Sequence, residues 1–139
     1  MVRRYFTLPE ARSILPDVLR HLLVCQSAFC ELKKLEPPSE LEGQGQVRRI
    51  SASPALLHEL RALRNSLATG QERLLQLGVE LQDLENGLVD FPTQFCGREA
   101  YFCWQQGEPT ISHWHPLKPA SGTRVHITDF PVAAFQCWS

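Results

Sequence analysis

Residues 98–115 read Arg98-Glu99-Ala100-Tyr101-Phe102-Cys103-Trp104-Gln105, then Gln106-Gly107-Glu108-Pro109, then Thr110-Ile111-Ser112-His113-Trp114-His115. The first and last of these runs are rich in aromatic and β-prone residues, and the middle run is a turn signal. The stretch therefore predicts a β-hairpin. A turn centred on Gly107 and Glu108 would place Phe102 opposite His113 and Trp104 opposite Ile111.

This pairing decides which side chains share a face, because successive side chains of a strand point to opposite faces. It puts His113 and His115 on one face together with Phe102 and Trp104. Cys103 falls on the other face, out of hydrogen-bond reach of both histidines, so a catalytic Cys–His pair is not expected. We interpret Cys103 as a buried packing thiol.

Two amphipathic helices are predicted before the hairpin. Thr7 and Glu10 have the spacing of a capping box, and Ser53-Pro54 is typical of a helix start. Two apolar seams follow, with a period of about 3.5 residues that indicates two helices packed side by side. They are Ala11, Leu15, Val18, Leu22, Cys25, Phe29 and Leu32, and then Leu57, Leu60, Leu63, Leu67, Gly70, Leu74, Leu77, Leu81 and Leu84. Pro16 should kink the first helix, and Asn86-Gly87 should end the second.

The predicted fold class is α+β, mostly α: a long antiparallel helical hairpin followed by a small aromatic-rich β-hairpin unit. Residues 1–139 are expected to form a single domain. The helical hairpin would occupy residues 7–84, with a flexible loop near 36–50. The β unit and an apolar tail would occupy residues 85–139, with a short third strand at 124–128.

Composition excludes several classes of protein. A net charge of −1 gives no field that would attract nucleic acid or anionic lipid. The five cysteines are scattered, which argues against a disulfide framework or a zinc ribbon. No signal peptide and no run of about 18 apolar residues is present, so no membrane span is expected. We therefore predict a cytoplasmic protein with reduced thiols.

Among cysteines and histidines, only His113 and His115 are closely spaced, and Asp90, Glu108 or His126 could add a third metal ligand. The favoured interpretation is a surface or interface histidine pair, so no structural zinc and no cofactor is predicted. Asp90 lies among apolar residues and has two interpretations. It is either a helix-end or turn carboxylate that accepts backbone N–H bonds, which is slightly favoured, or a buried carboxylate paired with Arg98, Arg124 or His115.

Apolar helix positions exceed what one seam can bury, and this excess predicts a homodimer. Those positions are Ile14, Leu19, Leu23, Leu56 and Leu75.

Several strings carry a family resemblance. They are Tyr5-Phe6-Thr7-Leu8-Pro9-Glu10-Ala11 with Leu15-Pro16, then 78–84 leading into Gly87-Leu88-Val89-Asp90-Phe91-Pro92, then 97–99, 103–104, 107–109 and Trp114-His115. In this order they resemble the bacterial family known as domain of unknown function 2203. The resemblance implies no activity. The family pattern contains an aspartate, an arginine, a glutamate and a histidine, matched here by Asp90, Arg98, Glu108 and His115. Its equivalent of His113 is often another aromatic residue, and 120–124 matches only loosely.

The leading functional hypothesis is a structural, interaction or small-ligand-binding protein that acts as a dimer, rather than an enzyme. The candidate binding residues are Asp90, Arg98, Trp104, Glu108, Trp114 and His115. The alternative is a metal-dependent or acid–base enzyme centred on Asp90, Glu108 and His115, with Arg98 as an anion clamp.

Overall fold

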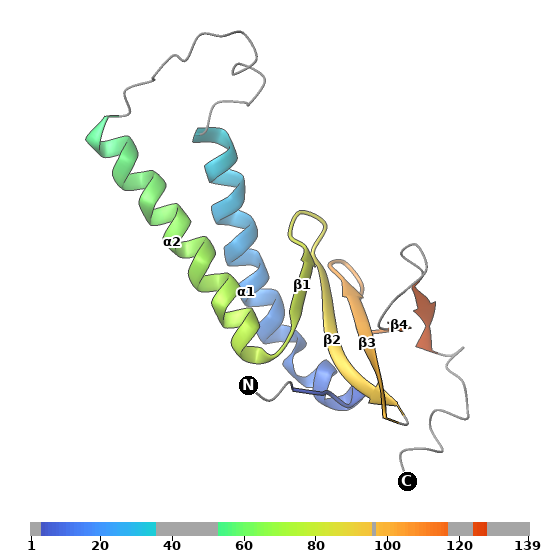
Figure 1. The fold of residues 1–139 in the computed structure, drawn as a ribbon. Coiled ribbons are helices and arrows are strands. Elements are labelled where there is room, and N and C mark those ends of the chain that lie inside the picture. Colours follow the sequence, from blue (N-terminus) through green and yellow to red (C-terminus); the bar gives the residue numbers. More distant parts are fainter. Residues whose placement is uncertain (1–3, 36–52, 96, 117–123, 128–139) are drawn as a thin grey trace, which may run out of the picture.

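The computed structural model describes residues 4–35, 53–95, 97–116 and 124–127. The predicted loop near 36–50 and the apolar tail after residue 127 lie outside these ranges. Two helices precede five strands: α1 (Leu8–Leu35), α2 (Pro54–Leu77), β1 (Glu80–Asp83), β2 (Leu88–Phe95), β3 (Arg98–Gln105), β4 (His113–Pro116) and β5 (Val125–His126). The helices form an antiparallel hairpin that stands beside the sheet (Figure 1).

Both predicted helix starts are confirmed. The Glu10 amide donates to Thr7 Oγ1 at 3.3 Å, and the Thr7 amide donates back to Glu10 Oε1 at 3.2 Å. At the second helix, the Leu56 amide donates to Ser53 Oγ at 3.1 Å, and Pro54 occupies the first turn. Pro16 lies inside α1 without ending it. Most of the predicted α1 seam is buried, as Ala11, Val18, Leu22, Cys25 and Leu32.

The predicted end of the second helix is wrong. The helix ends at Leu77 because Gly78 adopts the left-handed conformation, with a φ of 93°, and its amide bonds the last-turn carbonyls. Residues Glu80–Asp83 then form strand β1, although their sequence is helix-prone and keeps the leucine period. Gly87 does not stop a helix: it lies in the turn between β1 and β2, with a φ of 68°.

The predicted fold class is also wrong, because the β unit is larger than a hairpin. It is a five-stranded antiparallel sheet in the order β1-β2-β3-β4-β5. Strand β2, which contains Pro92, was not predicted. The Pro92 carbonyl accepts a bond from the Phe6 amide at 2.7 Å, so the side that lacks an N–H faces away from β3. Strand β1 pairs only with residues 88–90, so Pro92 breaks no ladder bond.

The predicted register of the aromatic hairpin is off by one residue. Tyr101 lies opposite His115 and Cys103 opposite His113, with Phe102 opposite Trp114. The turn is longer than predicted because Glu108 is held by β3: its carboxylate accepts from the Gln105 amide and its carbonyl from the Trp104 indole. Strand β4 therefore starts only at His113. A slip of one residue moves every side chain to the other face. The short strand predicted at 124–128 is confirmed only at Val125–His126, as β5, and residue 128 lies outside the described ranges.

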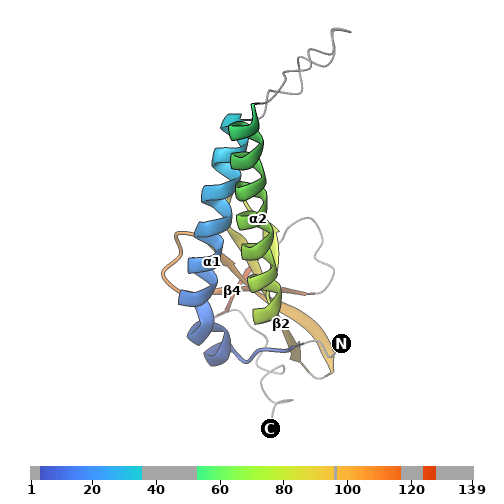
Figure 2. The ribbon, with the colours of Figure 1, turned by 90° about the vertical axis from the view of Figure 1, so that its left-hand side faces the viewer.

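The sheet has one apolar face and one polar face. The apolar face presents Val89, Phe91, Phe102 and Trp104 to α1 and joins the core that contains Val18, Leu22 and Leu74. Figure 2, viewed from the helix side, shows both helices in front of the sheet. The face away from the helices carries Asp90, Tyr101, Cys103, His113 and His115, by strand alternation and register. Neither described helix is long and apolar enough to cross a membrane.

Gly70 allows the close approach of the two helices. A Cβ atom added to it would lie 2.4 Å from Cys25 Sγ. We expect Gly70→Ala to lower the melting temperature, because this overlap outweighs the gain in helix propensity of about 1 kcal/mol. In a Cys25→Ala background the same change should be neutral or stabilising. A double-mutant cycle of thermal melts tests the coupling, and a Gly70→Ala protein more stable than wild type would contradict it.

Candidate functional site

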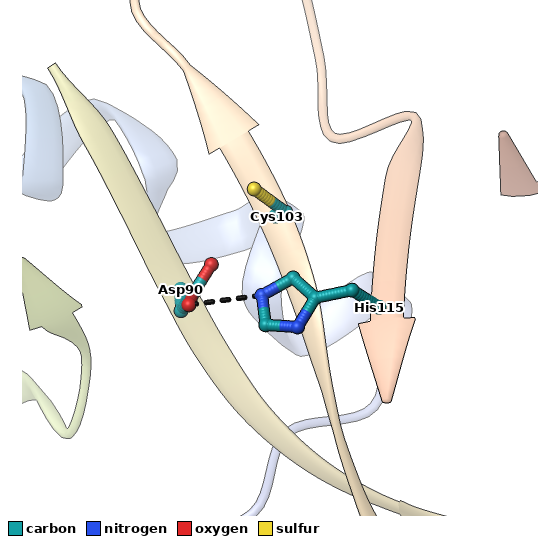
Figure 3. Close-up of side chains that lie close together, drawn as sticks. All are labelled: Asp90, Cys103 and His115. Carbon is teal, nitrogen blue, oxygen red and sulfur yellow. Dashed lines mark hydrogen bonds and ion pairs between the residues drawn. The ribbon is translucent and has the colours of Figure 1, made fainter. Parts of the chain in front are cut away.

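Three ionisable side chains from adjacent strands meet on the face of the sheet away from the helices. Asp90 of β2 pairs directly with Cys103 of β3, and His115 of β4 pairs with the neighbouring Tyr101. One carboxylate oxygen, the sulfur and one ring nitrogen all lie within 4.8 Å of one another. Figure 3 shows the imidazole directed at Asp90, with the sulfur beside both.

Asp90 and His115 form a buried pair. Asp90 Oδ2 lies 3.0 Å from His115 Nε2, and the two side chains are only 4% and 12% exposed. The other ring nitrogen, Nδ1, donates to the Pro116 carbonyl at 2.8 Å. The hydrogen bond to Asp90 raises the pKa of His115 against the opposing effect of burial, and the Pro116 carbonyl adds to the rise. Tyr101 stacks on the imidazole, so the ring is held in place on three sides.

The buried interpretation of Asp90 is confirmed, and the slightly favoured turn-carboxylate interpretation is wrong. Asp90 lies within β2, and its partner is His115 rather than Arg98 or Arg124. Its second oxygen, Oδ1, is buried and accepts no hydrogen bond from the described residues. An unsatisfied buried carboxylate oxygen is costly, so this atom marks a place where a further electrophilic partner would be favourable.

Cys103 corrects the predicted face assignment. The register places its sulfur on the same face as His115 and beside Asp90, not on the opposite face. The residue is fully buried. Burial raises the pKa of the Cys103 thiol to about 12, and the Asp90 carboxylate contributes to the rise, while Arg124 opposes it. The thiol is therefore protonated at neutral pH, which argues against a free nucleophilic thiolate.

Arg124, Glu108 and His113 form a second group that touches Cys103. Arg124 Nε donates to Cys103 Sγ at 3.3 Å, and its Nη2 donates to Glu108 Oε1 at 2.6 Å. Glu108 Oε2 lies 3.0 Å from His113 Nδ1. Burial acts to raise the pKa of Glu108, but the hydrogen bonds from Arg124 and the Gln105 amide outweigh it and lower the pKa. Glu108 is thus an ionised carboxylate that forms an ion pair with Arg124.

The remaining predicted candidates lie elsewhere. Arg98 is exposed at the first position of β3, at the opposite end of the strand from Cys103. Trp104 and Trp114 are on the helix-facing side, where Trp104 belongs to the core and Trp114 packs against it. The four residues of the family pattern therefore do not meet in one pocket. Cys103 and Arg124 were not predicted as site residues, and only the correct strand register would have revealed them.

The comparisons with known proteins support the family resemblance. Residues 4–127 match the family described as "Uncharacterized conserved protein (DUF2203)". The match includes both helices and all five described strands. No curated protein and no solved structure matches the chain.

We expect Asp90→Ala to lower the free energy of unfolding by about 3–5 kcal/mol, because it leaves His115 buried without its partner. Denaturant unfolding measures the loss, and Glu85→Ala, which removes only an exposed bridge to Lys33, is the control. The pKa of His115 is raised in the folded protein, so this stabilisation is complete below the ordinary value of 6.5 and is lost as pH rises through the raised pKa. If Asp90→Ala is as stable as wild type just below pH 6.5, where His115 is charged, the Asp90–His115 pair contributes nothing to stability.

Proposed function

We propose that this chain, which belongs to the DUF2203 family of uncharacterized conserved proteins, binds one divalent transition-metal ion through Asp90, Cys103 and His115. The observation that carries the proposal is the convergence of their three ligand atoms within 4.8 Å on the buried polar face of the sheet. The buried Asp90 Oδ1, which has no geometric hydrogen-bond partner among the described residues, agrees with it, because a metal ion is an electrophile that a carboxylate oxygen can bind.

The donor set favours zinc. Carboxylate oxygen, thiolate sulfur and imidazole nitrogen are the three ligand types that zinc takes in proteins, whereas calcium and magnesium select oxygen ligands. With zinc–ligand distances of about 2.0–2.3 Å, ligand atoms in a tetrahedral site are separated by roughly 3.3–3.6 Å. The present Asp90–His115 separation of 3.0 Å is close to that range. The three ligand atoms as a set lie within 4.8 Å of one another, so metal binding would need side-chain rotations that bring the Cys103 sulfur and the other two atoms together.

The hydrogen bond from His115 Nδ1 to the Pro116 carbonyl also fits a metal ligand. Metal-binding histidines usually donate their second ring nitrogen to a carbonyl or carboxylate, which fixes the tautomer and leaves the other nitrogen for the metal. Here Nδ1 makes that bond, and Nε2 faces Asp90 Oδ2. A bound ion would replace the proton between the carboxylate and the imidazole and also the thiol proton of Cys103, and both protons would be released to solvent.

Three protein ligands leave a fourth coordination position, as in catalytic zinc sites. Two observations nevertheless favour binding over the enzyme alternative. The ligand side chains of Asp90 and His115 are almost inaccessible, and the Glu108 carboxylate is occupied by Arg124 and is not directed at Asp90. The proposed function is therefore metal binding, with no assigned reaction.

The test uses protein stripped with a chelator and titrated with Co²⁺ or Zn²⁺. We expect one equivalent to bind, and the Co²⁺ form to show tetrahedral visible bands with a sulfur-to-cobalt charge-transfer band. Asp90→Ala and His115→Ala should weaken binding by at least about tenfold. Cys103→Ser keeps the size of the side chain and should abolish the charge-transfer band.

Cys25→Ala is the matched control, because Cys25 is also a buried thiol but lies between the helices. It should bind metal like wild type. Circular dichroism shows whether each variant is folded. Binding of less than a tenth of an equivalent by folded wild type, or an unchanged charge-transfer band in Cys103→Ser, would exclude the proposed site.

We further propose that the protein is a homodimer that associates through α2. Leu57 and Leu75 are 50% and 65% exposed. They are five turns apart at about 3.6 residues per turn, so they share one side of the helix. Antiparallel packing of two α2 helices about a two-fold axis would place each Leu57 against Leu75 of the second copy. The same arrangement brings Arg61 near Glu72 of the second copy, and both residues are exposed.

We expect light scattering at micromolar concentration to give twice the chain mass of 15.8 kDa. Leu57→Lys combined with Leu75→Lys should give the monomer mass with unchanged circular dichroism, because charges would replace the apolar contacts. Ala62→Lys, at an exposed position on another side of α2, should remain dimeric. A wild-type protein that scatters only as a monomer would contradict the proposal.

A further inference from the structure

The guanidinium of Arg124 contacts Cys103 at two points. Its Nε donates to the sulfur at 3.3 Å, and its Nη2 donates to the Cys103 carbonyl at 3.4 Å. Arg124 immediately precedes β5, which pairs with β4. The planar guanidinium places two donors on Cys103 at once, so it restrains both the backbone and the side chain of Cys103. A lysine ammonium cannot make this two-point contact.

Glu108 in turn fixes the guanidinium. Its Oε1 accepts from Arg124 at 2.6 Å and from the Gln105 amide, also at 2.6 Å. The Glu108 carbonyl accepts from the Trp104 indole at 3.0 Å. Trp104 belongs to the core. Glu108 therefore connects Arg124 to the packed core and limits the movement of its guanidinium.

We propose that Arg124, held by Glu108, is a positioning residue of the metal site: its Nε–H group holds the Cys103 sulfur towards Asp90 and His115 and weakens the electron donation of the sulfur to the metal. The inference rests on the proposed metal-binding function. Hydrogen bonds to a ligand sulfur are a known means by which proteins tune thiolate–metal bonds.

The charges around Arg124 favour this positioning role over a role in binding an anionic ligand. Ionised Asp90 and Cys103 would together balance a divalent ion, and Glu108 balances Arg124 at 2.6 Å. The site therefore has no surplus positive charge that an anionic ligand would neutralise. Without Arg124, the Glu108 carboxylate would keep only the Gln105 amide and His113 as partners.

The experiment compares Co²⁺-loaded wild type with Arg124→Met at full metal occupancy. Methionine keeps the length of the side chain and removes its donors. We expect the sulfur-to-cobalt charge-transfer band to move to lower energy, because the sulfur becomes a stronger donor, and the affinity for Co²⁺ to fall about 10–100-fold. Arg124→Lys should restore the charge but not the two-point contact, and should give an intermediate band.

Arg12→Met is the matched control. Arg12 donates to the Ile111 carbonyl at 3.0 Å, so it also ties a long side chain to the β3–β4 connection, but it touches no proposed ligand. Its Co²⁺ band should equal that of wild type. If Arg124→Met folds poorly because Glu108 has lost its guanidinium partner, Arg124→Met with Glu108→Gln removes both charges and should show the same band shift.

The outcomes separate the two proposals. A wild-type protein without a cobalt band would overturn the metal site and this inference together. A wild-type band that Cys103→Ser abolishes, but that stays at the same energy in Arg124→Met and in the double variant, would overturn only the role of Arg124. A shift of equal size in Arg12→Met would show that the effect is one of general packing and would also overturn it.

Discussion

The apolar face of the sheet has to be buried against α1, and this requirement determines the register of the strands. Val89, Phe91, Phe102 and Trp104 all belong to the core that α1 completes. A slip of one residue between β3 and β4 would turn Trp114 away from that core and expose apolar surface. The polar residues of the same strands are consequently brought together on the opposite face. Their grouping follows from the packing of the apolar residues and not from attraction among the polar side chains.

That opposite face concentrates ionisable groups that a sheet normally keeps in water. Asp90 and Cys103 are buried there, and His115 is nearly so. Burying such groups is costly unless they are paired. Most of the cost is offset, since Asp90 has His115, Glu108 has Arg124, and Arg124 reaches the Cys103 sulfur. Among the described residues of this face, Asp90 Oδ1 is the exception. Departures of this kind from a fully satisfied interior are expected at functional sites.

The two layers of contacts around Cys103 give the site its rigidity. The proposed ligand set comes from three neighbouring strands, while the supporting residues come from the β3–β4 connection and from the residue before β5. Strands are stiff supports, and side chains on them are held more closely than side chains on loops. A metal ion bound here would tie β2, β3 and β4 together and would add to the stability of the folded state by mass action.

Local sequence determined the starts of both helices, because capping residues such as Thr7, Glu10 and Ser53 act on amides within a few positions. The family resemblance named Asp90 and His115 as candidate binding residues. Local propensity failed at 80–83, where helix-prone residues form β1 after Gly78, and at Pro92, whose missing N–H is harmless only at that edge of β2. The grouping of Asp90 with Cys103, His115 and Arg124 was decided by tertiary structure alone. Side chains alternate between faces at every residue, so their partners depend on a register that only the packing of the whole sheet on α1 selects.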